Sequence, residues 1–265
     1  MTVTQSVMES FGSLTVRAVT SVGRLGVLFA ETLSWTVRDT FRVRFRVRET
    51  LYQMYLAAVE SLPIIGVSLA FTSLMLVTEF SFHMKLVLHQ DSLVPAFSTI
   101  LLLRELGPVL TSLLIASRVG AGYAAEIGTM KITEQLDALT LMGLDPVEYL
   151  TVPRWIACVF ACVALSIISL GISILGGSVM ASLTLGYTVG EYFNTMFTFA
   201  KFSDFAACGV KALVFGSIIP IVASSKGFRC RAGSEGVGEA ATQSVVQSSM
   251  WIIAADFLLT YLMYG

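Results

Sequence analysis

The sequence ASRVGAGYAAEIGTMKITEQLDALTLMGLDP, residues 116–146, is the longest polar helical stretch in an otherwise apolar chain. It lies between two apolar runs that are long enough to cross a membrane. Most connections between helices are short, whereas this one carries a helix of its own, which we predict at about 126–143. A helix outside the bilayer is accessible to a partner protein. Its polar residues are Glu126, Lys131, Glu134, Gln135 and Asp137.

The faces and ends of this helix follow from its residues. One side of the helical wheel is apolar or small, and the opposite side mixes apolar residues with Lys131 and Glu134. We therefore expect the helix to be held between its own spans and a partner. Gly143 is predicted to end it, and Asp145 with Pro146 to begin the next helix. The apolar or small stripe consists of Ile132, Leu136, Leu139 and Gly143.

The composition identifies an integral membrane protein. Of the 265 residues, 55% are hydrophobic and 13% charged, and the mean hydropathy is +0.78. A soluble domain carries about 25% charged residues. The net charge of −1 gives no indication of nucleic-acid binding. The four cysteines, Cys158, Cys162, Cys208 and Cys230, show no C-x-x-C spacing. The first three lie in apolar runs, which predicts buried free thiols there.

Five apolar runs predict an all-α, multi-pass membrane protein, since a transmembrane helix needs about 20 apolar residues. The second and third runs are longer than one simple span requires. The segment 51–265 is expected to form one membrane domain. The predicted spans are about 62–82, 93–125, 155–185, 205–224 and 245–264.

The first 50 residues form a separate, amphipathic N-terminal region. Between residues 13 and 35, Arg17, Arg24 and Glu31 recur every seven residues and share one face. This predicts a helix that lies in the membrane interface or packs on the protein itself. The arginine-rich stretch 38–48 is interpreted as a snorkelling segment on lipid headgroups or as a short strand. No cleavable signal peptide is expected at the N-terminus.

The distribution of Lys and Arg predicts the orientation. Basic residues cluster before the first span and in the loop between the fourth and fifth spans, whereas the loops after the first and third spans are poor in them. By the positive-inside rule, the N-terminus is cytoplasmic and the C-terminus external. The predicted helix at 126–143 then faces the cytoplasm. The basic residues of the last loop are Lys226, Arg229 and Arg231.

Four ionisable residues fall inside the predicted spans: Arg104, Glu105, Lys211 and Asp256. A charge at such depth costs at least about 2.5 kcal/mol. These residues are interpreted either as ion pairs that tie helices together or as the lining of a polar cavity for a charged or amphipathic substrate. Next to two of them, Gly107 and Pro108 predict a kink or break in the second span.

The sequence lacks a catalytic set. The two histidines, His83 and His89, have no metal-ligand partners at useful spacing, so no metal site is predicted. No Gly-x-x-x-x-Gly-Lys phosphate loop occurs in the sequence, so ATP for any transport has to be bound by another subunit. We expect a transport subunit without enzymatic activity of its own.

Several motifs together resemble the MlaE-type permease family, the transmembrane subunits of lipid-transport ABC systems that act with mammalian-cell-entry (MCE) proteins. The resemblance extends over most of the chain from the first span onward. The matching elements are LLRELGPVL (102–110), AEIGTMKITEQLDAL (125–139), DP (145–146), PRW (153–155), GVKALVFG (209–216) and ADFLLTYLMYG (255–265).

This resemblance implies a homodimer of permease subunits in the cell inner membrane, bound by a cytosolic ABC ATPase that holds ATP and Mg. It also implies an MCE-domain partner and phospholipid or a related lipid as the cargo, carried between inner and outer membranes. Arg104, Glu105, Lys211 and Asp256 would lie near the lipid pathway. The alternative is a secondary transporter that uses Glu105 and Asp256 as proton-coupled carboxylates. The implied coupling residues for the ATPase are Glu126, Met130, Lys131, Glu134, Gln135, Asp137 and Leu141.

Overall fold

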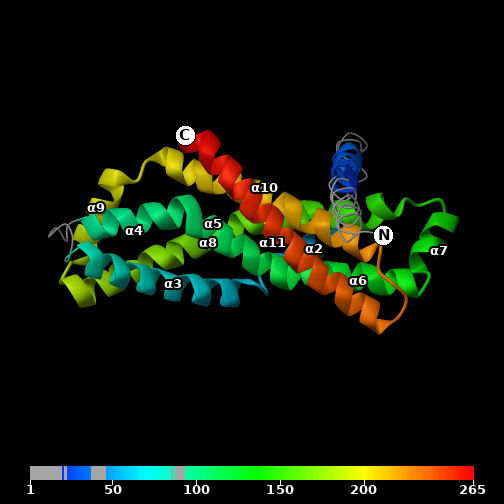
Figure 1. Ribbon diagram of the computed structural model, residues 1–265, viewed down its shortest axis with the longest axis horizontal. Coiled ribbons are helices and arrows are strands. Elements are labelled where there is room, and N and C mark those ends of the chain that lie inside the picture. Colours follow the sequence, from blue (N-terminus) through cyan, green and yellow to red (C-terminus); the bar gives the residue numbers. More distant parts are fainter. Residues whose placement is uncertain (1–19, 21–22, 37–45, 85, 87–92) are drawn as a thin grey trace, which may run out of the picture.

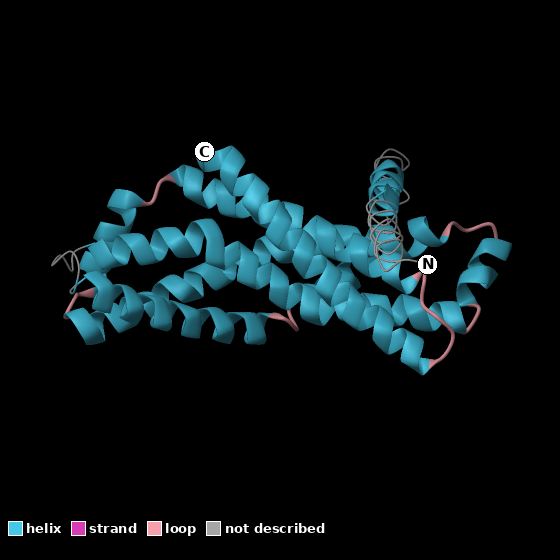
Figure 2. Ribbon diagram, in the orientation of Figure 1, coloured by secondary structure: helices cyan, strands magenta, loops and turns pink. Residues whose placement is uncertain are grey.

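The computed structural model of the protein describes residues 20, 23–36, 46–84, 86 and 93–265. Within these ranges every regular element is a helix, and short loops join the helices (Figure 2). This confirms the all-α prediction. Most of the arginine-rich stretch 38–48 lies outside the described residues.

The helices follow one another with few interruptions. Three of the elements are five-residue π-helical turns, here labelled η, which continue directly into α-helices. The elements are α2 (Val47–Ala58), α3 (Leu62–His83), α4 (Val94–Leu101), η3 (Leu102–Leu106), α5 (Gly107–Ile115), η4 (Ala116–Gly120), α6 (Ala121–Ile132), α7 (Gln135–Leu141), η5 (Val147–Thr151), α8 (Val152–Leu185), α9 (Val189–Phe199), α10 (Phe202–Gly227) and α11 (Ser234–Tyr264).

Five stretches of the described chain are long and apolar enough to cross a membrane, as predicted, but each is longer than expected. The third was predicted to start at 155, and its helical run starts at Val147, because Pro153 falls in the first turn of α8, where proline is tolerated. The fifth was predicted to start at 245, and its helix includes a polar beginning from Ser234. The stretches are Val47–His83, Val94–Ile132, Val147–Leu185, Phe202–Gly227 and Ser234–Tyr264.

The long helices run roughly along the long axis of an elongated bundle (Figure 1). At one end lie α7 and the connection between α10 and α11, and at the other end lies α9 (Figure 1). The long helix α8 is central, because it packs against α2, α3, α5 and α10. A run of 39 residues such as Val147–Leu185 is about 58 Å long as a helix, well above the roughly 30 Å hydrocarbon core of a bilayer. The bundle therefore extends beyond the membrane.

Small residues allow these helices to approach closely. A Cβ atom added to Gly216 of α10 would lie 2.9 Å from Cys162 Cβ and 3.1 Å from the Cys158 carbonyl oxygen of α8. A Cβ atom on Gly177 would lie 2.8 Å from the hydroxyls of Ser73 and Tyr192. Close glycine contacts of this kind are how membrane helices gain van der Waals packing without a hydrophobic driving force.

Of the kink or break predicted at Gly107 and Pro108, the break does not occur, because the second span stays helical from Val94 to Ile132. The irregularity is instead the π-helical turn Leu102–Leu106, whose hydrogen bonding ends with the Gly107 N–H donating to the Leu102 carbonyl. Pro108 follows in the first turn of α5 and needs no hydrogen bond there. The extra residue of the π turn accommodates the proline without ending the helix.

The single helix predicted at about 126–143 is also wrong. Its first part is the end of the second span, α6, and its second part is the separate short helix α7. Glu134 divides them with a left-handed backbone conformation, φ 59°, and the Thr133 hydroxyl donates to the Thr129 carbonyl at 2.9 Å. The stripe of apolar or small residues that was predicted on one helix is therefore divided: Ile132 lies on α6, and Leu136 and Leu139 lie on α7.

The two ends predicted for this region are confirmed. Gly143 has φ 75°, and the Leu144 N–H donates to the Leu139 carbonyl, closing the glycine-ended helix stop expected for α7. The Asp145 side chain accepts the Val147 N–H at 2.8 Å and so caps the next helical segment.

The described part of the N-terminal region, residues 23–36, is helical as predicted, and in Figure 1 it stands across the long axis of the bundle. It contacts the protein, since Leu25 and Phe29 line a cavity together with residues of α10 and α11. The packed interpretation therefore holds for this part of the helix. Its placement in a membrane interface stays a prediction.

Candidate functional site

Three of the four ionisable residues predicted inside the spans come together around Lys211 of α10. The Lys211 side chain is completely buried. Its Nζ atom lies 2.7 Å from Asp256 Oδ1 of α11 and 3.1 Å from Glu105 Oε2 of η3. The lysine thus joins three segments that are far apart in the sequence.

The remaining contacts of Lys211 are neutral. Its Nζ donates to the Thr260 hydroxyl at 2.7 Å and to the Arg104 carbonyl at 2.6 Å, and the Thr260 hydroxyl donates to Glu105 Oε1 at 3.1 Å. In a regular α-helix the Arg104 carbonyl would accept from residue 108, which here is a proline without an N–H. The Lys211 ammonium therefore donates a hydrogen bond to a carbonyl that cannot receive one from Pro108.

The fourth residue, Arg104, forms a neighbouring cluster with a residue that the sequence analysis did not select. Its Nε and Nη2 atoms both lie 2.9 Å from Oδ1 of the fully buried Asp204. The Tyr264 hydroxyl donates to the same oxygen at 3.2 Å, and the Tyr264 ring lies 4.2 Å from the Arg104 guanidinium carbon. The second oxygen of Asp204 accepts the Lys201 N–H at 3.0 Å. The predicted spans leave Asp204 in the loop after the third span, whereas it lies in the first turn of α10.

Both original interpretations of these charges find support in the geometry. The ion pairs tie the second, fourth and fifth spans together. At the same time, the carboxylates are not sealed off: the Glu105 side chain is 30% exposed and that of Asp256 18%, whereas Lys211 is 0% exposed. With all groups ionised, two carboxylates surround one ammonium, so this cluster carries an excess negative charge that reaches an apolar surface. Partly exposed carboxylates of this kind can bind a charged headgroup or a proton.

The possible metal ligands of the described chain are a separate matter from these two clusters of charges. No group of three or more possible metal ligands occurs among the described residues. Cys158, Cys162 and Cys208 are free and buried, as predicted, and Cys230 is free and buried as well. His83 lies 3.4 Å from Glu79 one turn earlier on the exposed side of α3, and His89 is outside the described residues.

The residues predicted to contact an ATPase fall at the end of the bundle that holds α7, but they do not form one helical face. Glu126 pairs with the buried Arg154 of α8 at 2.8 Å. Met130 and Glu126 line a cavity of about 900 Å³ between α2, α6 and the start of α8. Lys131 is half-buried at the end of α6, and the remaining four residues are exposed on or next to α7: Glu134, Gln135, Asp137 and Leu141.

The short helix α7 is anchored on one side and open on the other. Leu136 and Leu139 are buried and pack with Leu150. On the opposite side Leu141 is 89% exposed and Met142 67% exposed. Seven residues of isolated helix are not stable in water, so α7 depends on this leucine contact for its structure. Its outer side is a compact apolar projection with acidic neighbours.

Comparison with known proteins assigns the sequence of this chain to a family. The model of the family described as Permease MlaE matches residues 50–262. The intermembrane phospholipid transport system permease protein MlaE of Haemophilus influenzae is 35% identical over 214 residues, covering 80% of this chain and 82% of that protein. A probable ABC transporter permease protein of Synechocystis sp. is 38% identical over 225 residues, covering 83% and 84% of the two chains. One of Rickettsia felis is 32% identical over 259 residues, or 98% of each chain.

Proposed function

Because the chain belongs to the MlaE permease family, we propose that it is the membrane-spanning subunit of an ABC transporter that carries phospholipid or a related lipid between the inner and outer membranes. It works in the cell inner membrane with its N-terminus in the cytoplasm. It has no enzymatic activity of its own and binds no cofactor.

The observation that carries this proposal is the Lys211 cluster. Each charge at membrane depth costs a few kcal/mol unless it is paired, and apolar residues of similar size would often stabilise a purely structural contact as well or better. The cluster is nevertheless kept with two partly exposed carboxylates, Glu105 and Asp256. Next to it, Arg104 is 32% exposed. These side chains offer both signs of charge to the headgroup of an amphipathic molecule, while its chains remain among apolar residues.

The energy is supplied by a separate cytosolic ATPase, which binds ATP and Mg. The sequence of this chain contains no phosphate loop, and the relatives are named as permease proteins of ABC transporters. The ATPase contacts the open side of α7, where Leu141 projects between acidic residues such as Glu134 and Asp137. Glu126 and Met130 act from the adjoining cavity rather than from the same helical face.

A second copy of this chain covers the outer face of α11. Large apolar side chains there are strongly exposed, including Phe257 at 71%, Tyr261 at 68% and Leu262 at 77%. Asp256 precedes Phe257 and points from the edge of this face toward Lys211, so a homodimer would bring two Lys211 clusters toward one central pathway. An MCE-domain protein on the external side is proposed on the family resemblance alone.

One observation favours a second candidate, a proton-coupled secondary transporter. Glu105 and Asp256 share the single ammonium group of Lys211, and a pair of carboxylates with one cation can exchange a proton during transport. This mechanism would need no ATPase.

Reconstitution separates the two candidates. The full chain is placed in lipid vesicles, and transfer of a fluorescent phospholipid is measured with the cognate ATPase and ATP, with the ATPase and ADP, or with a proton gradient and no ATPase. We expect transfer only with ATP and the ATPase. Transfer driven by the proton gradient alone would contradict the proposal and establish the second candidate.

A further inference from the structure

A second charged region lies far along α10 from Lys211, at the end of the bundle that holds α7. A cavity of about 520 Å³ is enclosed by residue 24 of the N-terminal helix, the end of α10 and the beginning of α11. Four cations line it and one carboxylate faces them. The cations are Arg24, Lys226, Arg229 and Arg231, and the carboxylate is Glu239.

Among the described residues, most of this positive charge has no carboxylate partner. Arg231 lies 3.7 Å from Glu239, whereas no described carboxylate forms an ion pair with Arg24, Lys226 or Arg229. The Lys226 ammonium donates to a neutral amide oxygen of Gln243 at 3.1 Å. Glu31 lines a smaller adjoining cavity with Arg24 and Arg229 without pairing with either. The cavity therefore has room and charge for an anion.

Crowding of like charges supports this interpretation. Burial and the positive charge of Arg24 lower the pKa of Arg229. An anion placed between these guanidinium groups would relieve their repulsion. Arginine forks match phosphate oxygens in geometry, and the lysine adds a mobile point charge.

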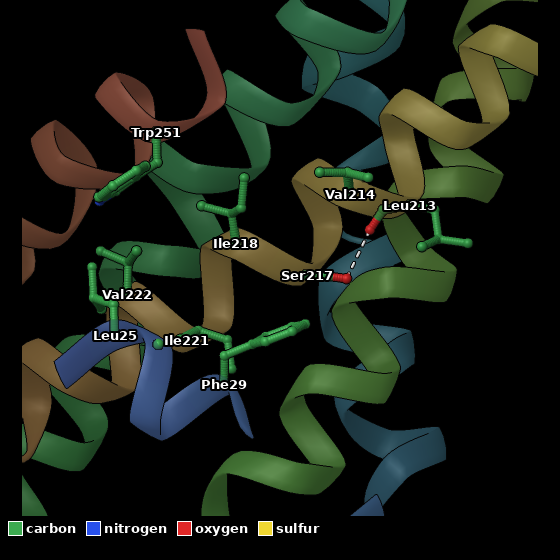
Figure 3. Close-up of a pocket in the computed structure, with 10 residues that line it drawn as sticks. Leu25, Phe29, Leu213, Val214, Ser217, Ile218, Ile221, Val222 and Trp251 are labelled. Carbon is green, nitrogen blue, oxygen red and sulfur yellow. Dashed lines mark hydrogen bonds between the residues drawn. The ribbon is translucent and has the colours of Figure 1, made fainter. Parts of the chain in front are cut away.

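The opposite face of the N-terminal helix shows at what depth this cavity lies. Leu25 and Phe29 point toward α10, where they line an apolar cavity of about 460 Å³ with Ile221 and with Trp251 of α11 (Figure 3). The Ser217 hydroxyl in this cavity is already bonded to the Leu213 carbonyl at 2.9 Å, as the dashed line in Figure 3 shows. One face of the helix is thus directed to hydrocarbon and the other to cations.

The rise of α10 relates the two cavities to two layers of one membrane leaflet: the apolar cavity to the hydrocarbon layer and the basic cavity to the headgroup layer. The α10 residues of the apolar cavity run from Leu213 to Val222, which is about 13 Å along the axis and close to half of a 30 Å hydrocarbon core. Lys226 lies one turn beyond Val222, about 6 Å further along. The basic cavity is therefore at headgroup depth, where lipid phosphates are the most abundant anions.

We propose that Arg24, Lys226 and Arg229 bind the phosphate of an anionic membrane lipid in this cavity, at a site separate from the Lys211 cluster. The bound headgroup links the N-terminal helix to the ends of α10 and α11. It thereby fixes the segment next to α7, which the proposed ATPase contacts. The site does not depend on which lipid the protein transports.

Thermal unfolding of the purified full chain in neutral detergent tests the site, because a ligand that binds the folded state raises Tm. Phosphatidylglycerol is titrated as the probe, with phosphatidylcholine and sodium phosphate in parallel. Removing one cation near the headgroups is worth about fivefold in affinity, so we expect Arg229→Gln to weaken binding about fivefold and Lys226→Gln with Arg229→Gln about thirtyfold. Arg229→Lys keeps the charge but loses the forked geometry, so it should weaken binding less than Arg229→Gln does.

Arg231→Gln is the matched control, because it removes the same charge from the rim of the same cavity, where the side chain is 82% exposed and already paired. We expect less than a twofold change for it. The proposal is overturned if the double variant, eluting and unfolding as a folded protein, keeps its response to phosphatidylglycerol. It is equally overturned if sodium phosphate raises Tm as much at the same concentration, because the site would then take a soluble anion. Neither ATPase nor nucleotide is present, so the outcome is independent of the proposed transport.

Discussion

The Lys211 cluster and the end of the bundle around α7 differ in whether their charged side chains are paired within the chain or exposed. Around Lys211, an ammonium that is completely buried has two carboxylates, a hydroxyl and a carbonyl as partners from the same chain. Around α7, the acidic residues are exposed, and Leu141 projects with 89% of its surface accessible. In the first region the chain satisfies its own polar groups, as a membrane interior requires. In the second it leaves apolar and acidic side chains exposed, on the surface that we propose for the ATPase.

The contrast separates what holds the fold from what serves other molecules. Changes at Lys211 should affect the folded state itself. Changes at the partly exposed carboxylates should mainly affect transport, and changes at the outside of α7 should affect only association. The following variants test this ordering from the largest expected effect to the smallest.

Lys211→Met should have the largest effect, because it leaves Glu105 and Asp256 next to each other without their cation. Removing one partner of a buried ion pair costs about 3–5 kcal/mol. We expect a strong loss of Tm and of folded protein in the membrane. Adding Glu105→Gln and Asp256→Asn to the same variant should restore much of the stability, and a triple variant as unstable as Lys211→Met would contradict the account. Lys131→Met, at a half-buried site outside the cluster, should change stability by less than about 0.5 kcal/mol.

Glu105→Ala and Asp256→Ala should lower lipid transfer more than they lower the amount of folded protein. Loss of one charge-assisted interaction with a headgroup is worth about 1.5–3 kcal/mol, or roughly tenfold or more in rate. Transfer by the reconstituted system is normalised to the folded fraction from size-exclusion chromatography. Equal losses of transfer and of folded protein would show that these carboxylates are structural ion-pair partners only.

Glu134→Lys should weaken association with the ATPase without changing Tm. The residue is exposed between α6 and α7, and reversal of one charge at the edge of an interface is worth about 1 kcal/mol, or roughly fivefold in Kd. Titration of the ATPase against the full chain in detergent measures the change. Glu235→Lys, an exposed acid at the start of α11, is the control and should bind normally. If both variants bind alike, Glu134 has no role in coupling.

The smallest effect is expected at Glu191, which begins α9 outside the spans. The Thr188 N–H donates to Glu191 Oε2 at 2.8 Å and the Thr188 hydroxyl at 2.9 Å, and the backbone bond is the main reason that the Glu191 pKa lies below its ordinary value of 4.5. A lowered pKa stabilises the folded state above the ordinary value, and this stabilisation is lost as pH falls through the lowered pKa. Unfolding of the natural chain should therefore gain a small pH dependence below about 4.5 that Glu191→Gln lacks. If the natural chain and Glu191→Gln unfold with the same pH dependence, the hydrogen bonds between Thr188 and Glu191 do not stabilise the folded state.

The fold was predictable to the extent that it depends on apolar length and on local caps. Five apolar runs give five spans, and Gly143 and Asp145 end and begin helices where their chemistry requires it. No break occurs at Pro108 because a π-helical turn precedes it. The sequence shows neither this turn nor the hydrogen bond from the distant Lys211 to the Arg104 carbonyl. The division of 126–143 depends on the left-handed conformation of Glu134, which an acidic residue does not predict.

The sequence predicted most of the charged residues of the candidate site but not which of them form ion pairs with one another. The cost of charge in a membrane selected Arg104, Glu105, Lys211 and Asp256, and three of them meet. Asp204 was missed because the sequence of its segment is aromatic and polar, as in a loop. An available signal was its position three residues after Lys201, where an acid caps the start of a helix. Pairing between helices requires the packed structure, because spacing along the chain does not determine which helices are neighbours.

The central claim is that the surface next to the Lys211 cluster is part of a lipid pathway driven by a separate ATPase. A photo-crosslinking amino acid at Tyr261, 68% exposed on α11, is compared with one at Phe71, 68% exposed on α3. Both are measured in vesicles with the ATPase, before and after ATP, and bound lipid is identified by mass spectrometry. We expect phospholipid crosslinking at Tyr261 to change with ATP and to lose this response in Glu105→Ala, while crosslinking at Phe71 stays constant. An equal, ATP-independent yield at both positions would contradict the claim.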